Sequence, residues 1–202
     1  MPTLITALLL CLQVIPASPP RLRVDIVFTG LPMRPRFEAA AMKEVTDIWG
    51  AYSVDVQTVH PNDPGRADAV RLSVALTDHP DRQVATDALG SILFLDESPE
   101  PAIVMYPDAI AALVSSSRVS DHLVGDWPYA LRDIVHGRAL GRALAHEIGH
   151  FLLRSREHSS VGLMRARQSV FDLISTERKG FTLSADEATR LCPRRRRRFA
   201  GQ

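Results

Sequence analysis

The stretch His146-Glu147-Ile148-Gly149-His150 contains the residue types of a metal-dependent hydrolase. Two histidines four residues apart lie on one face of a helix, about one turn from each other, so both imidazoles can bind a single metal ion. The glutamate points in a different direction and is better placed beside a metal-bound water than on the metal. This division of roles is the HExxH signature of zinc hydrolases, in which Glu147 would be the general base.

The residues around the motif indicate the helix that this chemistry requires. Apolar residues recur there at helical spacing: Leu131, Ile134, Val135, Leu140, Leu144, Ile148, Phe151 and Leu152. We expect a long helix that Asp126 caps, that has Pro128 in its first turn and that ends at about Leu153. Gly137 and Gly141 inside this helix indicate close packing or an interruption.

The chain before this helix has the pattern of a sheet with one backing helix. Alternating and branched residues predict strands at 21–29, 53–59, 69–77, 88–94 and 102–106, with a turn at 96–101. An apolar stripe predicts an amphipathic helix over 36–52, and a short helix is expected within 109–120. The opening order of strand, helix, strand, strand predicts a twisted sheet backed by a helix.

The sequence after the motif predicts less regular structure. Residues 170–174 are compatible with a helix or a loop. Ser184 to Glu187 form a capping box ahead of a last short helix, which we expect to end near Leu191 and to be stopped by Pro193.

The length of 202 residues is that of one domain with a sizeable core. The net charge of +1 includes five consecutive arginines, Arg194 to Arg198, so the rest of the chain carries −4. We expect this run to be a solvated tail, with binding to polyanions as the alternative. Because aromatic residues do not alternate with the arginines, no specific nucleic-acid partner is expected.

Residues 1–18 have the pattern of a secretory signal peptide. They carry no charged side chain, and the apolar run from Leu4 to Ile15 is followed by Pro16-Ala17-Ser18. The run is short for a membrane span, and the alternative is a buried first strand. Cleavage would remove Cys11 and leave Cys192 alone, so no internal disulfide is expected in a secreted or periplasmic protein.

The motif and the residues after it resemble the metzincin clan of zinc peptidases, and matrixin-type domains most of all. In that clan a third histidine follows a glycine turn, and a methionine in a tight turn lies beneath the metal. The run His158-Ser159-Ser160-Val161-Gly162-Leu163-Met164 resembles this segment. The resemblance implies an α+β, zincin-like fold: a twisted, mostly parallel five-stranded sheet, a backing helix, a long active-site helix and a short C-terminal helix. The catalytic domain would be residues 19–192, followed by a basic tail at 193–202.

The spacing after the motif departs from the family pattern. The family's glycine position is Leu153 here, its third-histidine position is Arg156, and His158 follows two residues later. We expect a slightly longer turn that still brings His158 to the metal, with Glu157 as the rival ligand. Acidic residues further along could complete the site as a glutamate does in another zincin clan: Asp172, Glu177 and Glu187.

The function that the resemblance implies is peptide-bond hydrolysis by a secreted endopeptidase with one catalytic Zn²⁺. The three histidines would leave the metal one open position for water, and Glu147 would move the proton. Met164 would pack beneath the site rather than bind the metal.

The strand predicted at 88–94 would form the upper rim of the substrate cleft. By the same resemblance, Gly90, Ser91 and Ile92 would pair with an extended peptide; the alternative is an ordinary interior strand. We expect a peptide or protein substrate, a monomer and no membrane span. The alternative function is a zincin-like protein that holds metal and binds a partner without proteolysis.

Overall fold

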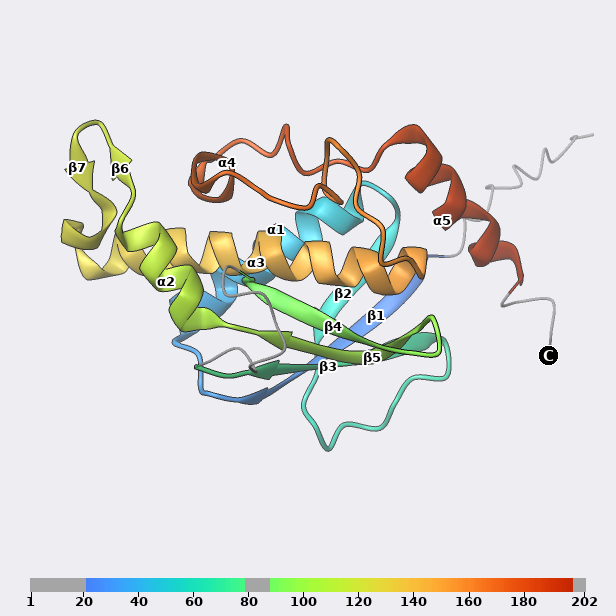
Figure 1. The fold of residues 1–202 in the computed structure, drawn as a ribbon. Helices are drawn as coiled ribbons and strands as arrows, with labels where there is room; N and C mark the ends of the chain where they lie inside the picture. The colour runs from blue at the N-terminus through green and yellow to red at the C-terminus, as the bar shows by residue number, and fades with distance from the viewer. Residues whose placement is uncertain (1–20, 79–87, 198–202) are drawn as a thin grey trace, which may run out of the picture.

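The computed structural model describes residues 21–78 and 88–197, with side chains up to Leu191. Its elements follow one another along the chain as Figure 1 shows. Their bounds are β1 Leu22–Gly30, α1 Pro35–Gly50, β2 Val54–Thr58, β3 Ala69–Leu76, β4 Gly90–Leu95, β5 Ser98–Met105, α2 Pro107–Ser115, β6 Arg118–Val119, β7 His122–Leu123, the 3₁₀ helix η1 Val124–Asp126, α3 Tyr129–Leu153, α4 Val170–Ile174 and α5 Ala185–Arg197.

Five strands form the main sheet in the order β2-β1-β3-β5-β4. Parallel pairs join β2 to β1, β1 to β3 and β3 to β5, whereas β4 runs antiparallel to β5 at the edge of the sheet. The predicted α+β class with a mostly parallel five-stranded sheet is therefore confirmed. The alternative of an interior strand at 88–94 is wrong, because β4 has the edge position.

The hairpin of β4 and β5 is longer than predicted. Only the first two residues of the expected turn, Asp96 and Glu97, reverse the chain, with φ values of 44° and 64°. Positive φ at both central residues is typical of two-residue hairpin turns. Pro99 and Pro101 are tolerated in β5 because this half of the strand pairs with β4 alone, and pairing with β3 begins at Ala102.

Helices α1 and α3 cover one face of the sheet and pack tightly against each other (Figure 1). A Cβ atom on Gly137 would lie 2.3 Å from the carbonyl oxygen of Phe37, and one on Gly141 would lie 2.3 Å from that of Ala41. Such separations are possible only without a side chain at these positions. The prediction of close packing at the two glycines is confirmed, and it fixes α3 against α1.

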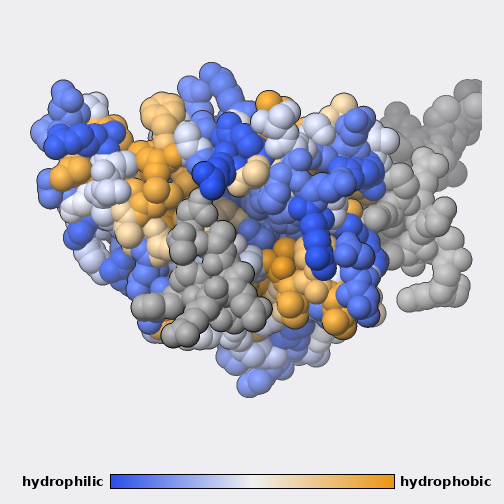
Figure 2. Space-filling view, in the orientation of Figure 1, coloured by the Kyte–Doolittle hydropathy of each residue, from blue (hydrophilic) through white to orange (hydrophobic). Residues whose placement is uncertain are grey.

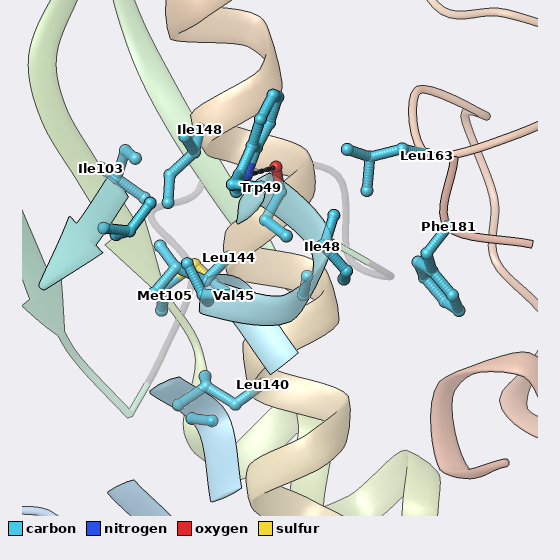
Figure 3. Close-up of a cluster of buried hydrophobic side chains, with 14 of the residues drawn as sticks. Val45, Ile48, Trp49, Ile103, Met105, Leu140, Leu144, Ile148, Leu163 and Phe181 are labelled. Carbon is cyan, nitrogen blue, oxygen red and sulfur yellow. Dashed lines mark hydrogen bonds between the residues drawn. The ribbon is translucent and has the colours of Figure 1, made fainter. Parts of the chain in front are cut away.

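Apolar side chains of the two helices and the sheet form one core (Figure 3). The core includes Leu144 and Ile148 of α3 and Met105 of β5. Trp49 of α1 is fully buried, and its Nε1 donates a hydrogen bond to the carbonyl oxygen of Ala145 at 3.2 Å. Because Ala145 directly precedes the HExxH motif, this bond ties the motif to the core.

The start of α3 differs from the prediction. Asp126 belongs to η1 and does not cap α3, which begins at Tyr129 with Pro128 at the N-cap position. Trp127 is extended, with φ −69° and ψ 156°. The helical conformation is disfavoured for a residue that precedes proline, so Trp127 is not part of α3. Pro128 is also non-helical, with ψ 138°.

The C-terminal helix α5 begins at the predicted capping box but ends later than expected. Ser184 N donates to Glu187 Oε2 at 2.7 Å, and Glu187 N donates to Ser184 Oγ at 3.3 Å, which confirms the box. The helix continues through Pro193 to Arg197, so the predicted end near Leu191 is wrong. A proline inside a helix removes one main-chain hydrogen bond and clashes with the preceding turn, which kinks a helix without always ending it.

The predicted signal peptide, residues 1–18, lies outside the described residues. Among the helices that the structure does describe, none combines the length and apolar character needed to cross a membrane.

Candidate metal centre

Three histidines converge at the C-terminal end of α3. One ring nitrogen from each of His146, His150 and His158 lies within 4.8 Å of the others. The Nε2 atoms of His146 and His150 are 3.0 Å apart, near the roughly 3.3 Å that separates two nitrogen ligands of one tetrahedral zinc ion. The ring of His158 is nearly parallel to that of His146 (14°) and perpendicular to that of His150 (88°). The number, type and spacing of these donors fit a zinc site.

Main-chain carbonyls orient the first two rings. His146 Nδ1 lies 2.8 Å from the carbonyl oxygen of Leu163, and His150 Nδ1 lies 2.7 Å from that of Ser155. Because a carbonyl only accepts, each Nδ1 carries the proton and each Nε2 presents its lone pair. Burial lowers the pKa of His146 to about 4 and also lowers the pKa of His150. Both rings are therefore neutral at pH 7, as metal ligands must be.

Glu147 lies in the same cleft but outside the ligand cluster. Its side chain is buried, and this burial raises the pKa of the carboxyl group to about 8. A divalent cation on the histidines would favour the ionised form and oppose this shift. A carboxyl group that exchanges its proton near neutral pH has the property of a general base.

A turn after α3 brings His158 back to the other two histidines. The helix ends at Leu153, and Arg154 adopts the left-handed conformation with φ 51°. Ser155 N then donates to the carbonyl oxygen of His150 at 3.2 Å. The turn thus lies one residue beyond Leu153, the family's glycine position, and is made by an arginine. This shift accounts for one of the two residues by which His158 comes later, and the loop from Arg154 to His158 supplies the other.

The Gly162-Leu163-Met164 turn packs directly against the motif. Gly162 has φ 83°, which glycine adopts without strain, and Leu163 N donates to the carbonyl oxygen of Thr182 at 2.8 Å. Met164 is buried, and a Cβ atom on Gly149 would lie 2.3 Å from its Sδ. The glycine inside the motif therefore makes room for the methionine, and Met164 packs against the helical turn that carries His146 and His150.

The acidic alternatives for the third ligand do not join the histidines. Within the part of the chain that the structure describes, the cluster contains the three histidines and no carboxylate. Glu187 is buried and accepts a hydrogen bond from Ser159 Oγ, so it anchors the residue next to His158. The other acidic candidates also lie outside the cluster: Glu157, Asp172 and Glu177.

A cleft of about 780 Å³ contains the three histidines and Glu147. One wall is β4, and the three residues predicted to contact substrate all line it: Gly90, Ser91 and Ile92. The opposite wall comes from residues 165–168 and Leu173, which follow the methionine turn. Figure 2 shows apolar surface over the β4–β5 hairpin, where Leu93 and Leu95 are exposed, next to strongly hydrophilic side chains. An edge strand that lines a cleft offers its main chain to an extended peptide.

A buried ion pair that was not predicted from the sequence holds the segment that forms the wall opposite β4. Arg142 is fully buried in α3, and its Nε donates to Glu44 Oε2 of α1 at 3.0 Å. The same guanidinium donates to the main-chain carbonyls of Asp172 and Glu177, and Arg178 also donates to Glu44. The signal that could have revealed the pair is the position of Glu44 on the apolar stripe of α1, where a charge requires a buried partner.

The sheet, the two packed helices and the histidines at the end of α3 define a zincin-like fold. A solved structure with this fold is archaemetzincin from Methanopyrus kandleri, to which the chain is similar with a TM-score of 0.53 and 13% sequence identity. The match covers 91% of this chain and 99% of that chain. No family model matches the sequence, and no curated protein matches it.

Proposed function

We propose that the protein is a zinc-dependent endopeptidase of the metzincin type. The observation that carries this proposal is the convergence of His146, His150 and His158 beside the buried Glu147, in a cleft walled by an edge strand. Neutral imidazoles whose Nδ1 atoms bond to carbonyls are a donor set that zinc prefers. The similarity to a structure named archaemetzincin supports the same assignment.

The three histidines, Glu147, β4 and Met164 would each have a role in this reaction. A zinc ion held by the three histidines would acidify a water molecule and polarise the substrate carbonyl. Glu147 would accept the proton of the attacking water on its carboxylate and pass it to the leaving amine. The main chain of β4 would hold the substrate backbone in an extended conformation, and Met164 would support the ligands from below.

We also propose that His158 is the third ligand, that each chain binds one zinc ion and that residues 1–18 direct secretion. The turn at Arg154, which returns the chain to the first two histidines, supports the ligand assignment. The apolar, uncharged start of the chain supports secretion.

Metal content of variants tests the site. We expect about one zinc ion per wild-type chain and a sharp loss in His158→Ala. His122→Ala is the matched control, because His122 is an exposed histidine on β7, and it should keep the metal. Zinc content unchanged by His158→Ala would place the third ligand elsewhere.

Peptide cleavage tests the reaction. Glu147→Gln should keep its zinc and lower kcat at least about a hundredfold, because it removes the proton acceptor. Retained cleavage would refute the role of Glu147. Zinc binding by a wild-type protein that cleaves no peptide would instead favour the metal-containing binding protein.

A further inference from the structure

Arg156 lies over the ring of Phe94 in the wall of the cleft. Its guanidinium carbon is 4.7 Å from the ring centroid, and both residues line the cleft that contains the three histidines. Phe94 belongs to β4, and Arg156 comes two residues before His158 in the turn after α3. The contact therefore places a permanent positive charge beside the edge strand and close to the proposed third ligand.

The stacked arrangement keeps the hydrogen-bond donors of Arg156 available. A guanidinium stacks through its face and donates through its edge, so Phe94 restrains the plane without using the N–H groups. The acidic neighbour is Glu97, whose Oε1 lies 3.9 Å from Arg156 Nη1, with side chains 85% and 53% exposed. An exposed pair at this distance contributes little, so a ligand carboxylate can replace Glu97 at small cost.

The charges of the lining residues favour the same kind of ligand. Among the described residues that line the cleft, Glu147 is the only acid, whereas Arg156, Arg165 and Arg167 are cationic. Arg165 is already engaged, because its Nη2 lies 2.7 Å from Asp172 Oδ2. Arg156 is held against the ring of Phe94 in the cleft wall, close to the proposed third ligand, and is therefore placed to bind an incoming anion.

We propose that Arg156 binds a carboxylate of the substrate, so that the protein prefers peptides with an acidic group near the bond to be cleaved. This inference rests on the proposed peptidase function. The carboxylate can belong to an aspartate or glutamate side chain or to the C terminus of the peptide. Both sources make the same two-point hydrogen-bonded pair with a guanidinium.

Matched peptides test the preference. A peptide that the wild-type protein cleaves is resynthesised with glutamate or glutamine at each position flanking the cleaved bond, and with a free or amidated C terminus. We expect kcat/KM to be about tenfold higher with the carboxylate and the ratio to fall to about one in Arg156→Gln. A fall in kcat/KM when the C terminus is amidated, with no fall when glutamate is replaced by glutamine, would identify the C-terminal carboxylate as the group bound.

Arg66→Gln is the control for net charge. Arg66 is exposed in the loop between β2 and β3 and does not line the cleft, so its variant should keep the preference. Equal cleavage of the matched peptides by the wild-type protein would overturn the proposal. A preference that persists in Arg156→Gln would overturn it as well.

A binding measurement separates this proposal from the proposed reaction. Two fluorescein-labelled peptides that differ only in glutamate or glutamine are titrated with Glu147→Gln, and anisotropy reports binding. Tighter binding of the glutamate peptide by Glu147→Gln, together with loss of this difference in the double variant Glu147→Gln/Arg156→Gln, supports the carboxylate site. This holds even if the wild-type protein cleaves neither peptide. Equal binding of the two peptides refutes the carboxylate site even if cleavage occurs.

Discussion

Replacing Gly149 with alanine tests how strongly the methionine turn is coupled to the metal ligands. The new Cβ atom would lie 2.3 Å from Met164 Sδ, whereas ordinary non-bonded contacts are about 3.5–4.0 Å. The two groups must therefore separate by roughly 1.5 Å. Because Met164 is buried, we expect a loss of about 1–3 kcal/mol in the free energy of unfolding, as for other overpacked cores.

The same displacement should weaken metal binding. Leu163 directly precedes Met164, and its carbonyl oxygen accepts the hydrogen bond from His146 Nδ1 at 2.8 Å. A shift of the turn lengthens or breaks this bond. Loss of the hydrogen-bond acceptor of a metal-binding histidine lowers metal affinity by about 10–100-fold. Competition with a chromogenic chelator would measure this loss in Gly149→Ala.

Gly141→Ala is the matched control for this experiment. The new Cβ atom at position 141 would lie 2.3 Å from the main-chain oxygen of Ala41. This oxygen belongs to the backbone of α1 and cannot move unless the whole helix moves. We expect Gly141→Ala to lose more stability than Gly149→Ala in urea unfolding but to keep wild-type zinc affinity in its folded fraction. Wild-type affinity in folded Gly149→Ala would refute the coupling. Adding Met164→Ala to Gly149→Ala should relieve the clash and recover part of the lost affinity.

Three further predictions concern a buried acid, a buried ion pair and a loop anchor. Glu147→Gln should stabilise the metal-free protein, because the folded-state pKa of about 8 lies above the ordinary 4.5. The free-energy cost of burying the ionised carboxylate is absent below pH 4.5 and grows to about 3 kcal/mol at pH 7. Glu147→Gln should therefore raise the free energy of unfolding, measured with urea, by more at pH 7.5 than at pH 5. Equal gains at the two pH values would contradict this. Arg142→Met should cost about 3 kcal/mol because Glu44 loses a buried partner, and an unchanged unfolding midpoint would show that the pair is dispensable. Glu187→Ala should lower zinc affinity about tenfold, since Ser159 beside the third ligand loses its anchor; unchanged affinity in the chelator assay would count against that role.

The features that could be predicted from the sequence are those set by neighbouring residues. The two motif histidines are four residues apart, so helix geometry alone brings them together. The capping box from Ser184 to Glu187 is a contact within one helical turn, and it forms as predicted. The close approach at Gly137 and Gly141 was also predictable, because two glycines on one face of a long helix require a reason.

The features that could not be predicted depend on residues far apart in the chain. Glu44 and Arg142 are 98 positions apart. The position of Glu44 on the apolar stripe of α1 indicates a buried partner, but it does not indicate which residue that partner is. The position of Phe94 under Arg156 likewise depends on the meeting of β4 with the turn after α3. Asp126 failed as a cap for a local reason: it fits the N-cap pattern, but the residue before a proline is extended.

The proposed ligands all come from one short stretch, residues 146–158, and this has a consequence for how the metal is exchanged. Helix α3 is held in place by the glycine contacts with α1 and by the bond from Trp49, none of which includes a ligand. Closing the loop between the second and third histidines costs little chain entropy, because the loop is short. A metal ion held by these residues would enter or leave by local opening of this loop, on the timescale of loop motion and without global unfolding. A protein built in this way would fold first and bind the ion afterwards.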